Sequence, residues 1–403
     1  MTRAVSRRRM LAAGAALLGG AAAGAVAATA ADALSEPSPP SLPGAFGADV
    51  VPFHGAHQAG VETPQQSHTW FVGLDLRPGQ TVADMRRLMA LWTDDAVRLT
   101  AGTAALADLE SELATTPSRL TITLGLGSGF FSSLDLDAQR PPSLKPLPAF
   151  AVDRLDGRWP ATDVLLQVGS DDVMTVSHAV RVLTRGARSF VDPAWVQRGF
   201  VRSRGVAPAG TTPRNLMGQV DGTSNPAPGT AELDRTVWSA DGPSWWHGGT
   251  MLVLRRIRME LDTWERLGRT DREMAIGRRL PDGSPLAGGG EHAQVDLETV
   301  GADGLLVVPE LAHVRQAKAR HDSERMLRRG YTYDDSPGAA SVSDVGLLFA
   351  AYVADVDRQF VPVQRRLEAA DLLNKWTTPV GSAVYALPPG AGPGEAWCDS
   401  LLA

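Results

Sequence analysis

Asp221 is the single acid of a glycine-containing stretch, Asn215–Pro226, that holds no other charged side chain. Aspartate beside glycine is common in surface turns, because glycine reaches positive φ without a Cβ clash and aspartate accepts local backbone hydrogen bonds. Judged alone, the stretch is more typical of a turn than of a site. The functional alternative is a carboxylate on a bent backbone that a ligand can approach closely, where it could accept and return a proton.

His313 lies in the segment 309–315, and the cations Arg315, Lys318 and Arg320 stand at or soon after its end. A lone histidine in an apolar stretch is usually a core residue with an ordinary hydrogen-bond partner. One imidazole can also be the sole protein ligand of a haem iron, and nearby cations would suit the two haem propionates. Such a ligand needs an acceptor at its second ring nitrogen. The residues alone leave both interpretations open.

Other candidates for chemistry are weaker. His54 and His57 have the spacing of a metal pair, but no Cys or carboxylate cluster at zinc spacing accompanies them. His292 follows a run of glycines and is interpreted as a loop residue. The single Cys398 cannot form an internal disulfide and has no histidine near it in sequence, which disfavours a thiol nucleophile. The sequence contains no serine-hydrolase elbow, zincin helix or P-loop.

The N-terminus is predicted to be a targeting segment. Consecutive arginines at positions 7–9 precede an Ala/Gly/Leu-rich run to about Ala28, which indicates a twin-arginine export signal over residues 1–33. The alternatives are an ordinary secretory signal or one anchoring helix, although the Ala- and Gly-rich composition disfavours a stable membrane span. A Pro-rich linker is expected at 34–50. We therefore expect export by the twin-arginine machinery to the periplasm, the cell envelope or the exterior.

The charge balance is acidic. The formal net charge is −6, and residues 1–33 contain four arginines and one aspartate, so the chain without them carries −9. This disfavours a surface for polyanions, and we expect no nucleic-acid partner. The near absence of cysteine fits a chain exported already folded, which would allow a cofactor to be inserted in the cytoplasm. About 370 residues remain, enough for two domains with their own cores.

Hydrophobic periodicity predicts the same order of elements twice. The first half is expected to have strands at 69–76, 120–126 (half-buried), 164–168 and near 199–202, with helices at 81–100 and 172–185. The second half is expected to have strands at 250–261, 305–308, 345–353 and 383–387, with helices at 262–276 and 356–367. This is the split βαβ pattern. The predicted fold is α+β, with two ferredoxin-like domains (51–205 and 206–403) and antiparallel sheets of the dimeric α+β barrel type.

A series of segments resembles the dye-decolourising peroxidases, and among them the exported, iron-uptake-associated group. The segments are Phe53–Gln65, Gly218–Gly222 (the Gly-x-x-Asp-Gly motif), Ala312–Arg315 (proximal histidine), Leu327–Tyr331 (distal arginine), Gly346–Phe349, and Val380–Ser382 with Pro388–Gly390. The similarity runs through residues 50–400 in this order. One departure is that the stretch between His313 and Arg328 is a few residues shorter than the family pattern.

The resemblance implies a haem b peroxidase with one haem per subunit, bound mainly by the second domain. His313 would be the proximal iron ligand. Asp221 would shuttle the peroxide proton, and Arg328 would stabilise charge during O–O cleavage. The remaining cofactor contacts implied are Gly222, Thr223, Ser224, Lys318, Arg320, Arg328 and Asp355, the last as the residue that orients His313.

Hydrogen peroxide and small phenolic or bulky dye-like reductants are then the expected substrates. An aspartate ordinarily ionises near pH 3.9, so a carboxylate shuttle stays a base in mild acid and predicts an acidic optimum. Tyr331, Tyr333, Tyr352 and Trp376 could relay electrons from large donors, although ordinary core and surface aromatics are the simpler interpretation. The alternatives are an iron-acquisition component that releases iron from haem (a deferrochelatase) beside iron-uptake partners, and a haem-binding or sensing protein without turnover. The oligomeric state stays open.

Overall fold

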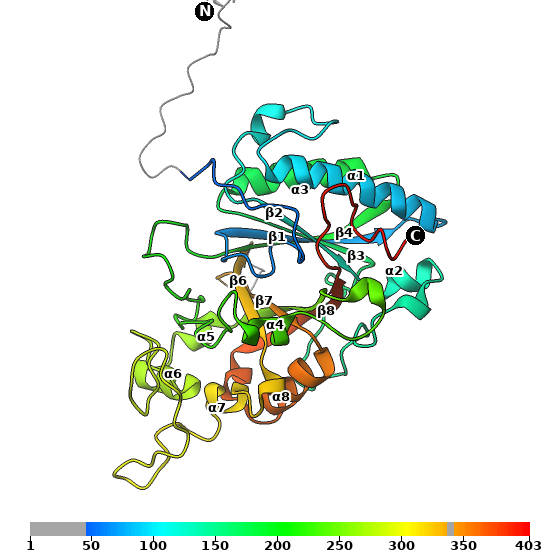
Figure 1. Ribbon diagram of the computed structural model, residues 1–403. Coiled ribbons are helices and arrows are strands. Elements are labelled where there is room, and N and C mark those ends of the chain that lie inside the picture. The colour runs from blue at the N-terminus through cyan, green and yellow to red at the C-terminus, as the bar shows by residue number, and fades with distance from the viewer. Residues whose placement is uncertain (1–45, 337–341) are drawn as a thin grey trace, which may run out of the picture. The chain divides into compact units, whose positions relative to one another are not determined.

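In the computed structural model, the described residues 46–336 and 342–403 place eight strands in one closed antiparallel barrel (Figure 1). The order around the barrel is β1-β3-β2-β8-β5-β7-β6-β4. The strands are β1 (His68–Leu76), β2 (Thr121–Leu126), β3 (Val164–Ser170), β4 (Val191–Phe200), β5 (Thr250–Met259), β6 (Leu327–Asp335), β7 (Asp344–Val353) and β8 (Thr377–Leu387). The helices are α1 (Val82–Thr100), α2 (Ser128–Ser133), α3 (Val173–Ala187), α4 (Ala231–Val237), α5 (Leu261–Trp264), α6 (Arg269–Ile276), α7 (His313–Ala317) and α8 (Val356–Ala370).

Each half of the chain has the strand order of a ferredoxin-like domain. In the first half β4-β1-β3-β2 lie side by side, with α1 and α3 as the two crossovers. The second half repeats the order as β8-β5-β7-β6, with α5 and α6 in the connection after β5 and α8 after β7. Every one of these pairs is antiparallel. The predicted fold class is therefore confirmed.

The two half-sheets meet at short contacts. Strand β2 meets β8 at Leu126↔Ala386, and β4 meets β6 at Phe200↔Thr332. The described chain from Phe46 onward is one compact unit. The domain boundary at residue 206 falls between β4 and β5 and stays a prediction. Most of the β6 edge beside β4 therefore needs hydrogen-bond partners other than a strand.

The barrel encloses large aromatic side chains. Phe71, Tyr331, Tyr352 and Tyr385 are fully buried in one cluster, separate from the larger core that includes residues of α1 and α3. In Figure 1, α1 and α3 lie side by side on one side of the barrel and α7 and α8 on the other. Every residue of β2 is buried, because one face of this strand meets the helices and the other the barrel interior. The half-buried prediction for this strand is therefore wrong.

Local sequence explains where the first two long helices begin. Thr81 caps α1 by accepting from the Asp84 amide, and the Asp84 carboxylate accepts from the Thr81 amide. Asp172, the predicted cap of the next helix, accepts from the Thr175 amide at 2.9 Å. In both helices apolar residues at 3–4 spacing face the core.

The second strand of the second half is misplaced by the sequence pattern. It is β6, whose first residues are those of the distal-arginine segment, and not 305–308. Leu305 is exposed, and the only pairing described there is an isolated bridge between Val300 and Leu306. A short apolar run without a partner strand therefore stays a loop, although Val308 is buried, whereas the charged segment 327–335 gains its pairing from β7.

Two other elements differ in extent. Strand β4 begins at Val191, well before the predicted 199–202, and its residues largely alternate between exposed and buried. Pro193 and the surface charges in this strand hide that alternation from a simple apolar count. The helix predicted at 262–276 is divided into α5 and α6, with Gly268 as the N-cap of the second.

Residues 1–45 hold the predicted export signal and most of the predicted linker, and they lie outside the described residues. Where the chain is described, it contains no helix with the length and apolar character needed to cross a membrane. The longest helix of the described residues, α1, has exposed charged residues along one face.

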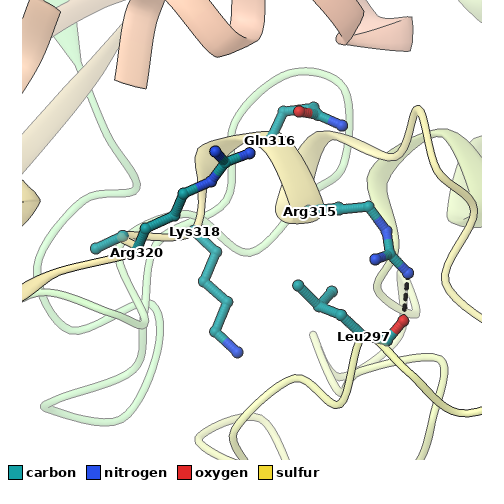
Figure 2. A pocket seen from close by; sticks show the side chains of 6 residues that line it. Leu297, Arg315, Gln316, Lys318 and Arg320 are labelled. Atoms are coloured by element: carbon teal, nitrogen blue, oxygen red, sulfur yellow. Dashed lines mark hydrogen bonds between the residues drawn. The ribbon is translucent and has the colours of Figure 1, made fainter. Parts of the chain in front are cut away.

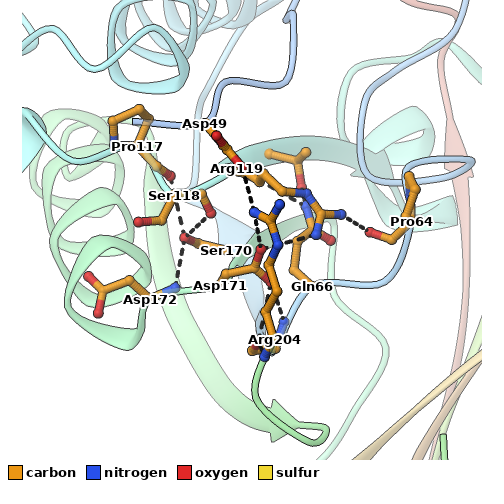
Figure 3. Close-up of polar contacts among 12 residues, drawn as sticks. Asp49, Pro64, Gln66, Pro117, Ser118, Arg119, Ser170, Asp171, Asp172 and Arg204 are labelled. Carbon is orange, nitrogen blue, oxygen red and sulfur yellow. Dashed lines mark hydrogen bonds and ion pairs between the residues drawn. The ribbon is translucent and has the colours of Figure 1, made fainter. Parts of the chain in front are cut away.

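A polar cluster fastens the segment before β1 to the ends of the first-half strands (Figure 3). Arg119 pairs with Asp171 at 3.0 Å and also donates to the carbonyl of Pro64. Arg204, just after β4, pairs with Asp49 at 2.6 Å and with Asp171 at 3.5 Å. The Asp171 side chain is only 6 % exposed, so its pair with Arg119 is shielded from solvent and holds Arg119 against the Pro64 carbonyl.

Candidate active site

His313 is the first residue of α7 and is held by a carboxylate. Its Nδ1 lies 2.6 Å from Oδ2 of Asp371, whose side chain is only 5 % exposed. Asp371 follows the end of α8, and its Oδ1 accepts from the Leu373 amide at 2.9 Å. Because a carboxylate accepts, Nδ1 carries the proton, and in the neutral ring Nε2 keeps its lone pair. The ring is thus held in the tautomer that a metal ligand needs.

Opposing effects set the pKa of His313. Burial disfavours the charged ring, but the Asp371 carboxylate outweighs burial and raises the pKa of His313 above its ordinary value. Arg328 lowers this pKa and Asp221 raises it, both more weakly. Both charges are therefore close enough to act on the imidazole. Asp221 and Arg328, both expected at one haem site with His313, are thus among the charges that act on its ring.

Asp355, expected to orient His313, has a different role. It is the N-cap of α8, and its Oδ1 accepts from the amides of Asp357 and Arg358 at 2.9 and 3.2 Å. That expectation is wrong, because the residue in contact with His313 is Asp371 at the other end of the same helix. The Leu372 amide also donates to the carbonyl of Leu311, which ties this end of α8 to the start of α7.

Asp221 and Arg328 form a loose pair. Asp221 Oδ1 lies 3.9 Å from Arg328 Nη1, and their side chains are 32 % and 28 % exposed. The distance exceeds a hydrogen bond, so each group retains capacity for another partner. Arg328 is the second residue of β6, and Asp221 lies on a loop whose Gly222 has φ of 121°. Only glycine adopts that backbone conformation readily, so the glycine after Asp221 has a structural reason.

The loop after Asp221 is fastened by Glu291, which directly follows the glycine run 288–290. Its Oε1 accepts from the hydroxyls of Thr212 at 2.6 Å and Thr223 at 3.0 Å. The Thr212 hydrogen bond lowers the pKa of Glu291, with a smaller contribution from Thr223, although partial burial opposes them. Thr223 therefore faces the Gly288–Glu291 turn, while Ser224 is exposed. No sequence motif marks Glu291 for this role.

A basic pocket of about 420 Å³ lies beside α7 (Figure 2). Its lining residues are Leu297, Arg315, Gln316, Lys318, Ala319 and Arg320. Arg315 donates to the carbonyls of Leu297 and Val308, and Lys318 to that of Val295. The cations at 315, 318 and 320 thus line a space large enough for carboxylate groups, and their role toward propionates stays a prediction.

A shielded ion pair holds the segment that carries these cations. Arg366 of α8 contacts both oxygens of Glu324 at 2.9 and 2.8 Å, and the two side chains are 13 % and 9 % exposed. Arg366 also donates to the carbonyl of Lys318 at 3.1 Å, and Glu324 accepts from the Arg320 amide at 2.8 Å. The bidentate geometry fixes the Lys318–Arg320 backbone against α8.

His54 and His57 place Nδ1 against the carbonyls of Ala391 and Gly248. Across the described residues, no group of three or more His, Cys, Asp and Glu side chains could hold a metal ion. Among the aromatic relay candidates, Tyr331, Tyr333 and Tyr352 are fully buried and Trp376 is partly exposed.

Two family models match almost the whole described chain. Residues 58–201 match the N-terminal part of the Dyp-type peroxidases and residues 212–392 the C-terminal part. A dye-decolorizing peroxidase of Thermobifida fusca is 38 % identical over 347 residues, covering 83 % of this chain and 81 % of the relative. A deferrochelatase of Escherichia coli K12 is 32 % identical over 385 residues, covering 90 % of each chain.

Solved structures agree with this assignment. A DyP-type peroxidase from Cellulomonas bogoriensis is 50 % identical with a TM-score of 0.86, covering 89 % of this chain and 99 % of its own. Ferric DtpA from Streptomyces lividans is 41 % identical with a TM-score of 0.85, covering 89 % of this chain and 98 % of its own. The chain belongs to the Dyp-type peroxidase family. It is accordingly a peroxidase of the dye-decolourising class, an enzyme that uses haem.

The described residues fit a haem. The His313 side chain is 31 % accessible, which leaves room for a ligand against the ring. In the neutral ring Nε2 offers a lone pair, and the cations of the basic pocket follow directly in the chain. An imidazole oriented by a carboxylate is a donor suited to haem iron.

Proposed function

We propose that the chain is a haem b peroxidase in which His313 binds the iron and Asp221 and Arg328 act on hydrogen peroxide. The observation that carries the proposal is the grouping of His313, oriented by Asp371 at 2.6 Å, with the charges of Asp221 and Arg328. Haem, when bound, supplies the redox chemistry with peroxide. Lys318 and Arg320 would hold its propionates, and Gly222 and Thr223 would border its edge.

The distal pair supplies proton transfer and charge stabilisation. Asp221 Oδ1 accepts a proton from peroxide and returns it to the departing oxygen, directly or through water. The Arg328 guanidinium stabilises the negative charge that develops as the O–O bond breaks. The 3.9 Å separation of Oδ1 and Nη1 supports these roles, since the two groups do not saturate each other. Phenols and bulky dyes are the reductants, with an optimum in mild acid.

Two substitutions test the distal roles. Asp221→Asn and Arg328→Leu are expected to lower the rate of reaction with peroxide by about 100-fold or more, since each removes a group from general acid–base or electrostatic catalysis. Full turnover in both variants would refute the assignment, and an optimum near pH 8 would argue against Asp221 as shuttle.

One spectrum tests the cofactor. His313→Ala should abolish the Soret band of the haem-loaded protein. The pyridine haemochrome spectrum of the wild-type protein should identify the cofactor as haem b. His321→Ala is the matched control, because His321 is exposed and lies only eight positions further along the chain. Retention of a native spectrum by His313→Ala would overturn the ligand assignment.

A second candidate function is release of iron from haem. It is supported by the deferrochelatase relatives that cover 90 % of this chain and by the N-terminal segment Phe53–Gln65. The test incubates haem-loaded protein under reducing and oxidising conditions and measures metal-free protoporphyrin by its fluorescence. Absence of that product in both conditions would eliminate this function. Its presence would favour partners from an iron-uptake system.

We also propose export through the twin-arginine pathway, supported by the arginines at 7–9 ahead of an apolar run. Replacing Arg8 and Arg9 by lysine keeps the charge and should retain the precursor inside the cell. Equal export of this variant would contradict the proposal and favour an ordinary secretory signal. Fractionation of cell envelope, periplasm and medium would locate the mature protein.

A further inference from the structure

The backbone of Arg328 is held by one side chain, Asn225. The Asn225 Nδ2 group donates to the Arg328 carbonyl oxygen at 2.7 Å, and the Arg328 amide donates to Asn225 Oδ1 at 3.0 Å. A primary amide carries both a donor and an acceptor, so one side chain satisfies both backbone groups. The guanidinium of this same residue lies 3.9 Å from Asp221.

The arrangement follows from the topology of the barrel. Strand β6 pairs with β7 along its length, but the register described with β4 is limited to Phe200↔Thr332. The outward amide and carbonyl of Arg328 therefore lack a neighbouring strand and need other partners. Two positions on, the outward carbonyl of Gly330 accepts from Gln65 Nε2 at 2.7 Å. Side-chain amides thus replace a strand at this edge, and the one at Arg328 comes from the Asp221 loop.

Asn225 and Asp221 belong to one short turn. The Asn225 amide donates to the Gly222 carbonyl at 3.0 Å, and the Asp221 amide donates to the Pro213 carbonyl at 2.9 Å. The turn depends on the positive φ of Gly222. A rigid turn that carries the carboxylate is thereby bonded directly to the residue that carries the guanidinium.

We propose that Asn225 is a positioning residue that sets the separation between Asp221 and Arg328. The proposal rests on the distal roles given under the proposed function. Without the two hydrogen bonds, the Asp221 loop and β6 have no direct bond to each other at this point, and the pair can move apart. A displacement of about 1 Å at a catalytic pair lowers rates by about 100-fold. Asn225→Ala is therefore expected to slow the reaction with peroxide by about 10- to 100-fold, with the KM for the organic donor unchanged.

The experiment compares Asn225→Ala and Asn225→Asp with Asn215→Ala in the haem-loaded protein. Asn225→Asp keeps the acceptor for the Arg328 amide but loses the donor, so an intermediate rate is expected. Asn215 lies in the same loop and accepts from the Met217 and Gln219 amides, not from β6, so it is the matched control. Equal slowing in Asn215→Ala would assign the effect to loop order and overturn the specific role of Asn225.

Two further measurements complete the test. Hydrogen exchange of the apoprotein should show faster exchange at the Arg328 amide in Asn225→Ala, independent of haem and turnover. In the background of Arg328→Leu, Asn225→Ala should cost little additional rate, because a positioning residue acts through its target. Additive losses would overturn the proposal. If Asp221→Asn and Arg328→Leu slow the reaction but Asn225→Ala does not, the inference fails alone; if neither of those variants slows it, the proposed function has failed.

Discussion

Asp371→Asn is expected to weaken haem binding by disturbing the tautomer of His313. The two carboxylate oxygens have separate duties, because Oδ2 accepts from His313 Nδ1 and Oδ1 accepts from the Leu373 amide. An asparagine offers one oxygen and one NH₂ group in the same space. If its oxygen faces His313, its NH₂ group meets the Leu373 amide donor to donor. If it is flipped, its NH₂ group meets Nδ1 and drives the imidazole proton to Nε2, where it blocks the iron.

The magnitude follows from the burial and length of the bond. A hydrogen bond to a charged group contributes about 1.5–3 kcal/mol, and at 2.6 Å with Asp371 only 5 % exposed this one lies in that range. Losing the partner of a ligating histidine typically lowers metal affinity by about 10- to 100-fold. That factor corresponds to about 1.4–2.7 kcal/mol, in agreement with the first figure.

The assay titrates haem into apoprotein and follows the Soret band, so that it measures binding without turnover. Asp355→Asn is the matched control, because Asp355 also caps a helix through backbone amides but does not contact His313. We expect a 10- to 100-fold weaker affinity only in Asp371→Asn. Unchanged affinity in this variant, or equal loss in both, would refute the reasoning that Asp371 orients the iron ligand.

Two further substitutions test the packing around the site and the stability of the fold. Burial and then Asp94 raise the pKa of Asp95 to about 6, so the stability that this carboxyl contributes is complete below its unfolded pKa near 4 and is lost as the pH rises through about 6. In urea unfolding, Asp95→Asn should therefore be up to about 3 kcal/mol more stable than wild type at pH 7 and about equally stable near pH 4. An equal gain at both pH values would contradict this reasoning. Arg366→Met leaves the shielded Glu324 carboxylate without its partner, which should lower the free energy of unfolding by about 3–5 kcal/mol. The Lys318 segment should then become sensitive to proteolysis. Adding Glu324→Gln should restore part of the lost stability.

The sequence predicts the fold well where periodicity coincides with burial. Both long first-half helices and β1, β3 and β7 lie close to the predicted positions, because their apolar residues are buried. The hydrophobic pattern does not predict β6, because this strand contains many charged and polar residues and depends on pairing with β7. An apolar run such as 305–308 carries no information about whether a partner strand is available.

The site shows the same limit at the level of single side chains. His313, Asp221 and Arg328 could be proposed from motifs, because each stands in a segment with a recognisable order of residues. Asp355 stands at the start of α8 and Asp371 at its end. Only the tertiary structure shows that Asp371 is the one that contacts His313 of α7. Asn225 likewise has no distinguishing sequence feature, since its role depends on which strand edge the barrel leaves without a neighbour.

The limited pairing of β4 with β6 links the architecture to the chemistry. If β4 paired with β6 beyond Thr332 toward Arg328, its backbone would occupy the amide and carbonyl that Asn225 now binds, and the Asp221 loop would lose its attachment. The two half-sheets therefore close the barrel at one register position and leave the next residues of β6 to side-chain amides. The amide that binds Arg328 comes from a loop, and this loop also carries the Asp221 carboxylate. A strand in its place would point successive side chains to opposite faces of the sheet, so it could not offer both the amide and the carboxylate to Arg328.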